Sequence, residues 1–384
     1  MYTIEETAKI MRQTDFRPKT FDQVVGQCEA KELLKIRIAA FKKTGGSIVH
    51  TLFLGPSGVG KTTLANVVAH EMGVRFHQIM ATRIKNFADF YNIIKNIEEG
   101  DVVFIDEIHA LAPRIQEHLY GVMEDFTCTI EDKNLNAQRT VKIPRFTLVG
   151  ATTHSGDLNA PLLSRFQSKI HLLPYSVEEL KCMIVSASER VYGVSMPSNV
   201  AEKLARLSRR TARVAYNLLR SFMDVAEART LNKVTSNMLN IELLHDMLRL
   251  EQIDPIIGLD QASRKYLVNL IRESKILRLN DNKNSSSTEA PKIIPIGLQP
   301  LATLATEQES TICSMIEPFL LSDIEFECND RKNGKMITEK SPFVRITKRG
   351  RIPTSSAVNY ILVCLNMQTN YGWFKNESLN IKPE

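Results

Sequence analysis

The sequence predicts an α/β fold in which a parallel sheet flanked by helices is followed by a helical segment and a basic segment. Apolar, strand-like runs recur through the first half of the 384-residue chain, with helical stretches between most of them. This alternation is typical of a parallel sheet with helices on both faces. After Ser176 the pattern becomes helical, and the last third carries a cluster of Lys and Arg. At about 150 residues per domain, the length favours two or three domains.

Five short apolar runs supply the predicted strands. Each is bounded by polar or small residues, as buried strands are. The runs are residues 51–54, 74–79, 102–105, 146–149 and 170–173. In a parallel sheet their carboxyl ends share one edge, which is where such folds bind ligands. We therefore look for functional residues directly after these runs.

The helical segment begins at Ser176, where Ser176-Val177-Glu178-Glu179 has the spacing of a capping box. That helix is predicted to run to about residue 192. A second helix follows Pro197-Ser198, and an Arg-rich third helix covers about 211–230. Together they predict a small all-α lid domain.

The last segment has the pattern of a winged helix, in which two helices precede a basic hairpin. The expected elements are helices at 261–274, 300–305 and 310–320 and a strand-prone stretch at 343–351. The Asn- and Ser-rich stretch 280–288 is predicted to be a surface loop. We expect a large domain at 1–175, the lid at 176–252, the winged helix at 253–371 and a tail at 372–384.

The motif Gly55-Pro56-Ser57-Gly58-Val59-Gly60-Lys61-Thr62 directly follows the first predicted strand and opens a helix. This is the setting of a phosphate-binding loop, because Gly55, Gly58 and Gly60 let backbone N–H groups point at an anion. Lys61 suits the β- and γ-phosphates, and the Thr62 hydroxyl suits Mg²⁺. The helix dipole adds to the same spot. Such a match alone also occurs in surface loops.

Asp106 and Glu107 supply a second motif, at the end of the predicted strand 102–105. Asp106 suits Mg²⁺, and Glu107 suits activation of a water molecule. The alternative is a helix cap after a core strand. The two motifs together favour hydrolysis of ATP bound with Mg²⁺.

Five further positions fit the binding and hydrolysis of ATP. Thr152 or Thr153, after the fourth strand, suits sensing of the γ-phosphate, although in isolation a simple strand-to-loop cap is the favoured interpretation. Arg165 suits stabilisation of a phosphoryl transition state in a neighbouring subunit, and the alternative is a surface ion pair. Arg213 opens the third lid helix and suits the γ-phosphate, or it is a helix-surface residue. Tyr175 stacks on adenine or fills the domain junction.

Composition is that of an ordinary globular chain, with 43% hydrophobic and 24% charged residues. The six cysteines are scattered, and we expect reduced thiols without disulfides. No apolar run reaches about 18 residues, and Met1 opens an acidic segment, so we expect neither a membrane span nor a secretory signal. Residues 331–351 hold eight Lys or Arg against the single acid Glu339, and a basic run alone is most often a solvated loop.

The chain resembles the RuvB family of AAA+ ATPases, the bacterial motors of Holliday-junction branch migration, from Arg17-Pro18 to about residue 360. The strings that carry the resemblance include Phe104-Ile105-Asp106-Glu107-Ile108-His109, Met123-Glu124-Asp125-Phe126, Gly150-Ala151-Thr152-Thr153, Ala160-Pro161-Leu162-Leu163-Ser164-Arg165-Phe166, Pro300-Leu301-Ala302-Thr303-Leu304-Ala305 and Arg349-Gly350-Arg351. The late strings separate this family from clamp loaders and protease ATPases.

The resemblance implies roles for particular residues around the nucleotide. Phe16 and Arg17, with Tyr175, would surround adenine, and the phosphates and Mg²⁺ would be held by Gly58, Gly60, Lys61, Thr62 and Thr63. Thr152 or Thr153 would be the first sensor, Arg213 the second, and Arg165 the arginine finger. Glu124, Asp125 and Phe126 would lie near the nucleotide at a subunit interface.

The resemblance also implies partners. Six copies would form a ring in the bacterial cytoplasm, at the nucleoid. A hairpin at about 127–142 would dock RuvA, with the resolvase RuvC as an indirect partner. Duplex DNA at four-way junctions would be held by phosphate contacts from Arg345, Arg349 and Arg351, which grip without reading sequence.

Several positions depart from the family pattern and lie mostly outside the motor half. Arg210 and Ala212 replace the usual Gly and Pro near Arg213, and Glu309 stands where a basic residue usually faces DNA. Ile346 and Lys348 change the wing, and residues 321–340 are extra. Two functions therefore stay open: a DNA motor, or an ATP-switched loader or initiator with little motor activity.

Overall fold

The computed structural model describes residues 16–132, 137–153, 155–231, 233–276, 293–329 and 336–371. The chain forms two compact units. The first runs to Met183 and includes the short pieces Arg190–Tyr192 and Thr211–Arg213, and the second contains the rest. The predicted loop at 280–288 and tail at 372–384 lie outside the described residues.

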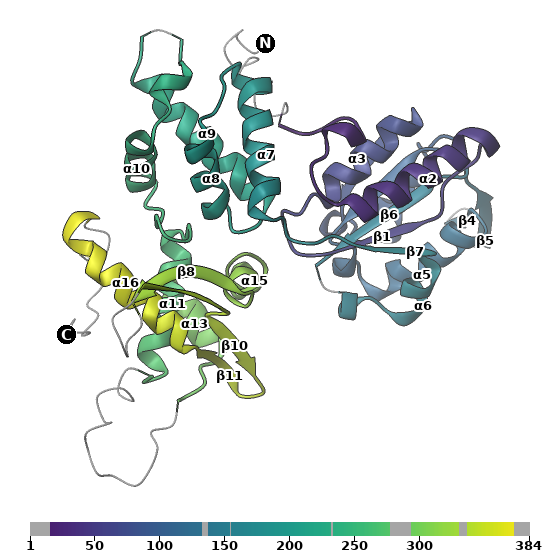
Figure 1. The fold of residues 1–384 in the computed structure, drawn as a ribbon. Helices are drawn as coiled ribbons and strands as arrows, with labels where there is room; N and C mark the ends of the chain where they lie inside the picture. Colours follow the sequence, from purple (N-terminus) through teal and green to yellow (C-terminus); the bar gives the residue numbers. More distant parts are fainter. Residues whose placement is uncertain are drawn as a thin grey trace. The chain divides into compact units, whose positions relative to one another are not determined.

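The first unit is built on a five-stranded sheet in which every pairing is parallel (Figure 1). The order is β2-β3-β6-β1-β7, so the predicted parallel sheet is confirmed. The strands are β1 (Thr51–Leu54), β2 (Phe76–Met80), β3 (Val102–Asp106), β6 (Thr147–Thr152) and β7 (Ser168–His171). The boundaries differ from the predicted runs by two or three residues at some ends, because strand pairing rather than apolar character alone sets where a strand stops.

Helices cover both faces of this sheet. Leu52 and Ile105 belong to one apolar cluster with side chains of α4, α5 and α6, whereas α3 contacts β2, β3 and β6. Strand residues alternate between faces, so the neighbouring Phe53 and Phe104, both fully buried, serve the other face. The helices are α2 (Cys28–Thr44), α3 (Lys61–Met72), α4 (Phe87–Ile94), α5 (Pro113–Glu124) and α6 (Ala160–Arg165).

Short elements complete the first unit. An antiparallel hairpin joins β4 (Thr127–Asp132) to β5 (Ala137–Lys142), which confirms the predicted hairpin, although residues 133–136 at its tip lie outside the described residues. 3₁₀ turns occur at Phe21–Gln23, Ala81–Arg83, Ile108–Ala110 and Ser155–Asp157.

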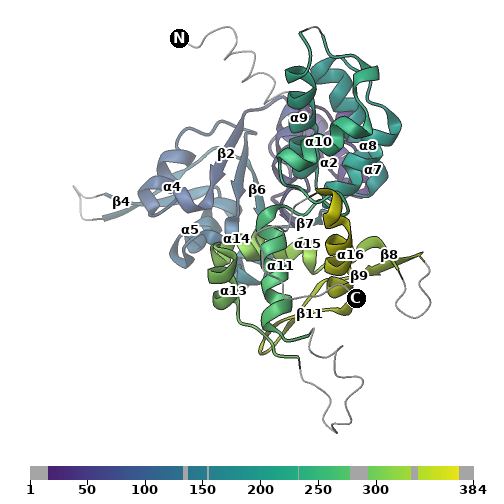
Figure 2. The same cartoon turned by 90° about the vertical axis from the view of Figure 1, so that its left-hand side faces the viewer.

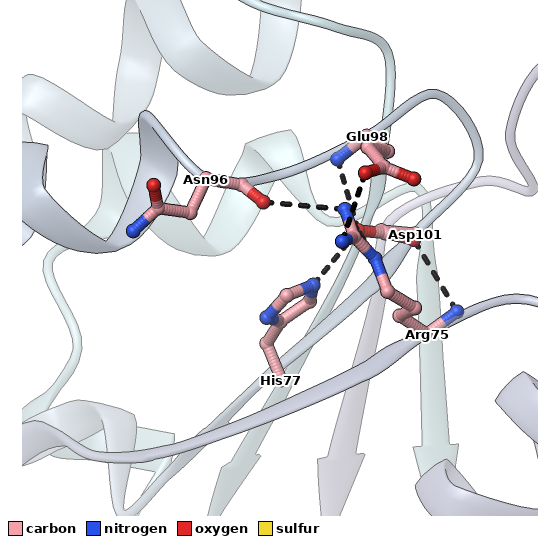
Figure 3. A network of polar contacts seen from close by, with 5 residues as sticks. All are labelled: Arg75, His77, Asn96, Glu98 and Asp101. Carbon is pink, nitrogen blue, oxygen red and sulfur yellow. Dashed lines mark hydrogen bonds and ion pairs between the residues drawn. The ribbon is translucent and has the colours of Figure 1, made fainter.

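A polar network joins β2 to the amino end of β3, at the edge opposite the carboxyl ends of the strands (Figure 3). Asp101 is 3% exposed and accepts hydrogen bonds from Arg75 Nε at 3.2 Å and from the Glu98 backbone N–H at 2.9 Å, and its Oδ2 lies 2.7 Å from His77 Nε2. Burial raises the pKa of Asp101, but the hydrogen bonds from Glu98, His77 and Arg75 outweigh it and hold the pKa below its usual value. This network holds β2 and β3 together and has no part in the nucleotide chemistry predicted above.

The second unit begins at Ile184, within the first of the lid helices. These helices bury apolar residues at helical spacing. The helix predicted from Ser176 is present, but its last turn is a π-turn at Ser188–Tyr192. The helices are α7 (Val177–Ala187), α8 (Ser198–Leu207), α9 (Ala212–Ala228) and α10 (Ile241–Leu250), with a 3₁₀ turn at Ser236–Met238.

The rest of the second unit has one apolar core that includes Leu267, Leu301, Phe343 and Tyr360. Figure 2 shows the helices and strands from which this core is built. The elements are α11 (Gln261–Glu273), α13 (Leu298–Ala305), α14 (Glu309–Thr311), a π-turn (Ile312–Ile316), α15 (Glu317–Leu320), β8 (Ile324–Asn329), β9 (Met336–Ser341), β10 (Val344–Thr347), β11 (Gly350–Pro353) and α16 (Ser355–Tyr371). The helix predicted at 310–320 is broken by the π-turn, since Pro318 cannot donate the next ladder hydrogen bond.

Two hairpins follow in this part of the chain. The basic hairpin β10–β11 is the predicted wing. The hairpin β8–β9 occupies the extra segment and was not predicted, but its Phe326 contacts the rings of Phe343 and Tyr360. The insertion is therefore part of the core. Within the described segments, no helix combines the length and apolar character needed to cross a bilayer.

Candidate functional site

The loop between β1 and α3 has the backbone that a phosphate cradle needs. Gly58 and Gly60 have φ of 81° and 99°, in the left-handed region that favours glycine. A Cβ at Gly60 would lie 2.9 Å from Tyr175 Oη, and one at Gly58 would lie 3.2 Å from the Cβ atoms of Thr211 and Arg213. Conformation and space therefore both require glycine here.

Lys61 is folded into this loop. Its side chain is buried, and Nζ donates to the carbonyls of Gly55 at 2.7 Å and Pro56 at 3.1 Å. Burial lowers the pKa of Lys61, while the carboxylates of Glu107 and Asp106 oppose that shift. The opposing influence means that the predicted acid pair lies near the lysine in the folded chain.

Asp106 ends β3 and is half-buried. Burial raises its pKa, the adjacent Glu107 raises it further, and Lys61 opposes the change. The Thr62 hydroxyl stands in the first turn of α3, also half-buried. A hydroxyl and a carboxylate are the hard oxygen donors that Mg²⁺ prefers, so this pair fits the predicted cation.

Glu107 lies in a small polar cluster at the end of β3 and β6. The Thr153 hydroxyl donates to Glu107 Oε2 at 3.3 Å, and His109 Nδ1 lies 3.3 Å from the same oxygen. His109 Nδ1 also lies 2.8 Å from Thr152 Oγ1. The structure thus brings the predicted base together with both sensor candidates, Thr153 directly and Thr152 through His109. The sequence analysis assigned no role to His109.

Arg213 contacts the phosphate loop, as its predicted role requires. Its Nη1 donates to Ser57 Oγ at 2.9 Å, and the neighbouring Ala212 N–H donates to the Gly58 carbonyl at 3.1 Å. Just before them, Arg209 and Arg210 have φ of 49° and 58°. The turn that leads into Arg213 therefore contains two consecutive arginines in the left-handed region.

The predicted adenine residues have different surroundings. Tyr175 is buried, and its hydroxyl donates to the Val59 carbonyl at 2.8 Å, so it supports the phosphate loop from behind. Phe16 is buried with its ring 6.1 Å from that of Tyr192. Arg17 is exposed.

Arg165, at the end of α6, is held by residues of α5. Its Nε lies 3.2 Å from Glu124 Oε1, and its guanidinium carbon lies 4.1 Å from the ring centroid of Tyr120. Asp125, at the end of α5, is exposed. Phe126 has φ of 50° and its ring is 6.1 Å from that of Phe146. The structure thus joins Glu124 to the predicted finger, whereas Phe126 joins the apolar cluster under the sheet.

The three wing arginines differ in their surroundings. Arg345 and Arg349 are exposed. Arg351 instead donates from Nε and Nη2 to the two oxygens of Glu317, at 2.8 and 3.2 Å, and Glu317 is 3% exposed. Tyr266 Oη donates to Glu317 Oε1 at 2.7 Å. The Glu317 hydrogen bonds raise the pKa of Arg351. Arg351 is therefore engaged inside the domain.

Comparison with known proteins gives consistent matches. The model of the Holliday junction DNA helicase RuvB P-loop domain matches residues 16–172, and that of the RuvB AAA lid domain matches residues 175–249. The Holliday junction branch migration complex subunit RuvB of Campylobacter hominis is 38% identical over 331 residues, covering 86% of this chain and 89% of that protein. The subunit of the same name from Campylobacter curvus is 35% identical over 372 residues, covering 95% and 97%.

A solved structure agrees over a similar length. The Thermotoga maritima RuvB Holliday junction branch migration motor gives a TM-score of 0.70 at 32% identity, covering 91% of this chain and 98% of that one. Identity at this level, sustained over most of each chain, shows that the chain belongs to the RuvB family of AAA+ P-loop ATPases.

Proposed function

We propose that this chain is an ATP-driven motor that moves four-way DNA junctions. The observation that carries the proposal is the nucleotide site, in which Lys61, Glu107 and Arg213 converge on one loop and strand edge. The names of its Campylobacter relatives, subunits of the Holliday junction branch migration complex, support the same activity.

Each part of ATP hydrolysis has a candidate residue. The loop N–H groups of Gly55, Gly58 and Gly60, with Lys61 and Thr63, would bind the phosphates. Thr62 and Asp106 would hold Mg²⁺, which would neutralise charge on the β- and γ-phosphates. Glu107 would accept a proton from the attacking water, Thr152 or Thr153 would sense the γ-phosphate, and Arg213 would report its presence to the lid. Phe16, Arg17 and Tyr175 would enclose the base.

Arg165 would complete the site of a neighbouring subunit. An arginine finger acting in trans requires that protomers share the nucleotide, and we propose a homohexameric ring for this reason. Glu124 and Asp125 would stand at that interface with the finger. Phe126 would support them from the apolar cluster.

DNA and protein partners follow from the remaining surfaces. The exposed Arg345 and Arg349 would contact duplex phosphates, while Arg351 would hold the wing in place. The hairpin β4–β5, within residues 127–142, would dock RuvA, and RuvC would join indirectly. The complex would work in the bacterial cytoplasm, at the nucleoid.

The deciding experiment measures ATP turnover with and without duplex DNA and RuvA, then follows a synthetic four-way junction by gel. We expect DNA and RuvA to stimulate turnover and the junction to be resolved into two duplexes. Glu107→Gln should still bind ATP but not hydrolyse it. Wild-type turnover in that variant would refute the assignment of the base.

A second function, that of an ATP-switched loader or initiator, is favoured by one observation. The helix expected to face DNA begins with the acidic Glu309 and exposes Met315 rather than a basic residue. Turnover without any junction movement would support this second function over the motor.

A further inference from the structure

The backbone at Glu107 turns the chain back onto the site. Glu107 has φ of 50° and ψ of 49°, a left-handed conformation that costs a non-glycine residue about 1–2 kcal/mol. The 3₁₀ turn Ile108–Ala110 follows at once, closed by the Ala110 N–H to the Glu107 carbonyl at 2.8 Å. Ile108 is fully buried and anchors the turn. As a result, His109 faces the carboxylate two residues before it.

His109 then joins two strands of the sheet. Its Nδ1 lies 2.8 Å from Thr152 Oγ1 on β6 and 3.3 Å from Glu107 Oε2 after β3. A carboxylate oxygen only accepts, and a hydroxyl oxygen also accepts, so a proton on Nδ1 satisfies both neighbours. One imidazole thus bridges the predicted base and a γ-phosphate sensor.

The bridge fixes one particular oxygen of Glu107. Oε2 receives the contacts from His109 and from the Thr153 hydroxyl. Within the described part of the chain, no hydrogen bond to Oε1 is formed. A general base works only when its accepting oxygen stands within hydrogen-bond reach of the water. Because Oε2 is held on two sides, Oε1 is the oxygen whose lone pairs are left to accept a proton from water.

We propose that His109 is a positioning residue for ATP hydrolysis, which orients the Glu107 carboxylate through Nδ1 and links it to Thr152. This inference rests on the proposed role of Glu107 as the base. It assigns His109 no contact with ATP. Loss of the imidazole should therefore change the rate of the chemical step and leave nucleotide binding nearly intact.

The experiment compares three substitutions in the full-length protein. In His109→Asn the side-chain amide reaches the place of Nδ1, in His109→Gln it reaches the place of Nε2, and in His109→Ala both are removed. We expect kcat for ATP to fall roughly 10- to 100-fold in His109→Ala and His109→Gln, with KM within about threefold of wild type. His109→Asn should recover most of the lost kcat, because it restores the donor beside Oε2.

Three results would overturn the proposal: kcat in His109→Ala within about twofold of wild type, equal losses in the Asn and Gln variants, or a loss confined to KM. A melting curve of each variant separates this role from a merely structural one. If His109 were only structural, all three substitutions would lower the melting temperature. If His109→Ala does not fold, the Asn and Gln pair decides alone.

The Glu107→Gln variant separates this inference from the proposed function. If Glu107→Gln hydrolyses ATP normally, the base assignment fails and the role of His109 fails with it. If Glu107→Gln is inactive while His109→Ala turns over like wild type, only the positioning role is refuted.

Discussion

At position 165 a guanidinium is held by a carboxylate and an aromatic ring of its own chain. Glu124 and Tyr120 fix the direction of Arg165, and a planar cation placed in this way loses little further freedom when it meets a phosphate. In the proposed role, Arg165 would therefore meet the phosphate of a neighbouring subunit with its direction already set.

We therefore predict that Arg165→Ala alone loses ATP turnover by about 10³-fold, as expected for removal of an arginine finger. Mixed with subunits carrying Glu107→Gln, which retain the finger but lack the base, it should regain part of that turnover. Steady-state ATPase assays across mixing ratios measure the effect.

Arg114 provides the matched control, since it lies on α5 and is exposed. Arg114→Ala should hydrolyse ATP like wild type. If mixtures of the two inactive variants show no recovery at any ratio, Arg165 does not act on a neighbour.

The half-buried carboxylate of Asp106 lowers the stability of the folded protein at neutral pH. Burial and the adjacent Glu107 raise its pKa, so the ionised form is disfavoured in the folded protein. The stability that the protonated group contributes is present below about pH 4, the pKa of an unfolded Asp, and is lost as pH rises through the folded value.

Asp106→Asn should therefore abolish ATP turnover yet raise the melting temperature at pH 7 in the presence of a chelator. The gain should shrink as pH falls toward the folded pKa, where the wild-type carboxyl is already protonated. Thermal melts between pH 4 and 8 test this, with the exposed Asp157→Asn as control. An Asn variant less stable than wild type at pH 7 would contradict the argument.

At the scale of elements, the wing is attached to the helix before it by the Arg351–Glu317 pair. Glu317 is 3% exposed, and Tyr266 donates to the same oxygen as Arg351 Nε. Removing one member of a buried pair leaves the other charge without compensation, which costs several kcal/mol.

We predict that Arg351→Ala lowers the free energy of unfolding of the second unit by about 3 kcal/mol. Arg349→Ala, two residues away on the exposed wing, should change it by less than about 0.5 kcal/mol. Urea unfolding of both variants measures the difference. Equal stabilities would mean that the ion pair contributes nothing to holding the wing.

For duplex DNA affinity the order should be reversed: replacing Arg349 should have a larger effect than replacing Arg351. Arg349→Ala should weaken duplex affinity for all sequences alike and reduce the slope of log K against log salt by about one unit, the signature of one lost phosphate contact. Fluorescence anisotropy at several salt concentrations gives the slope. An unchanged slope would remove Arg349 from the DNA contact.

At the scale of the whole molecule, the second unit joins the lid to the C-terminal domain through a tight set of contacts. Arg209 Nε donates to the Gly258 carbonyl at 2.7 Å, and its Nη2 lies 2.9 Å from Asp260 Oδ2. The buried Asp254 accepts backbone N–H groups of Ile257 and Ile256. The Arg209 contacts join the lid to the segment that leads into α11.

Gly258 lies at this junction, and a single added methyl group there should disrupt the contacts. It has φ of 77°, and a Cβ there would lie 2.1 Å from the Leu207 carbonyl oxygen. We predict that Gly258→Ala destabilises the second unit by at least about 2 kcal/mol. It should leave basal ATP turnover within about threefold of wild type while junction movement falls further.

Gly193→Ala is the control, because Gly193 also has a positive φ, 67°, but no atom within 4 Å of its added Cβ. It should cost only the conformational strain, about 1 kcal/mol. Equal destabilisation of the two variants, or equal loss of turnover and junction movement in Gly258→Ala, would contradict the coupling.

Much of the fold was predictable because its signals are local. The run ending at Leu54 with Lys61 just beyond it, the pair Asp106-Glu107 and the capping box at Ser176 each lie within a few residues of one another, and local spacing suffices to recognise them. The lid helices and the wing were predicted for the same reason. The hairpin β8–β9 was missed because its segment was interpreted as an insertion, although Ile324, Phe326 and Cys328 alternate with polar residues as in a half-buried strand. Its partner strand β9 is mostly exposed and carries no such alternation.

The sequence predicted which residues belong to the site but not which side chains contact one another. Arg165 pairs with a residue 41 positions away, Arg351 with one 34 away, and His109 with one 43 away. The only sequence signal for His109 is that it lies two residues after the acid pair. This spacing indicates a contact only when the left-handed backbone at Glu107 is known.

The sequence by itself determined the parallel sheet, the phosphate loop, the acid pair and family membership, because apolar periodicity and motif spacing are encoded over short stretches of chain. The tertiary structure alone decided which wing arginines are exposed, which one is paired with Glu317 and which oxygen of Glu107 is held. Those outcomes depend on side chains that only folding brings within hydrogen-bond distance.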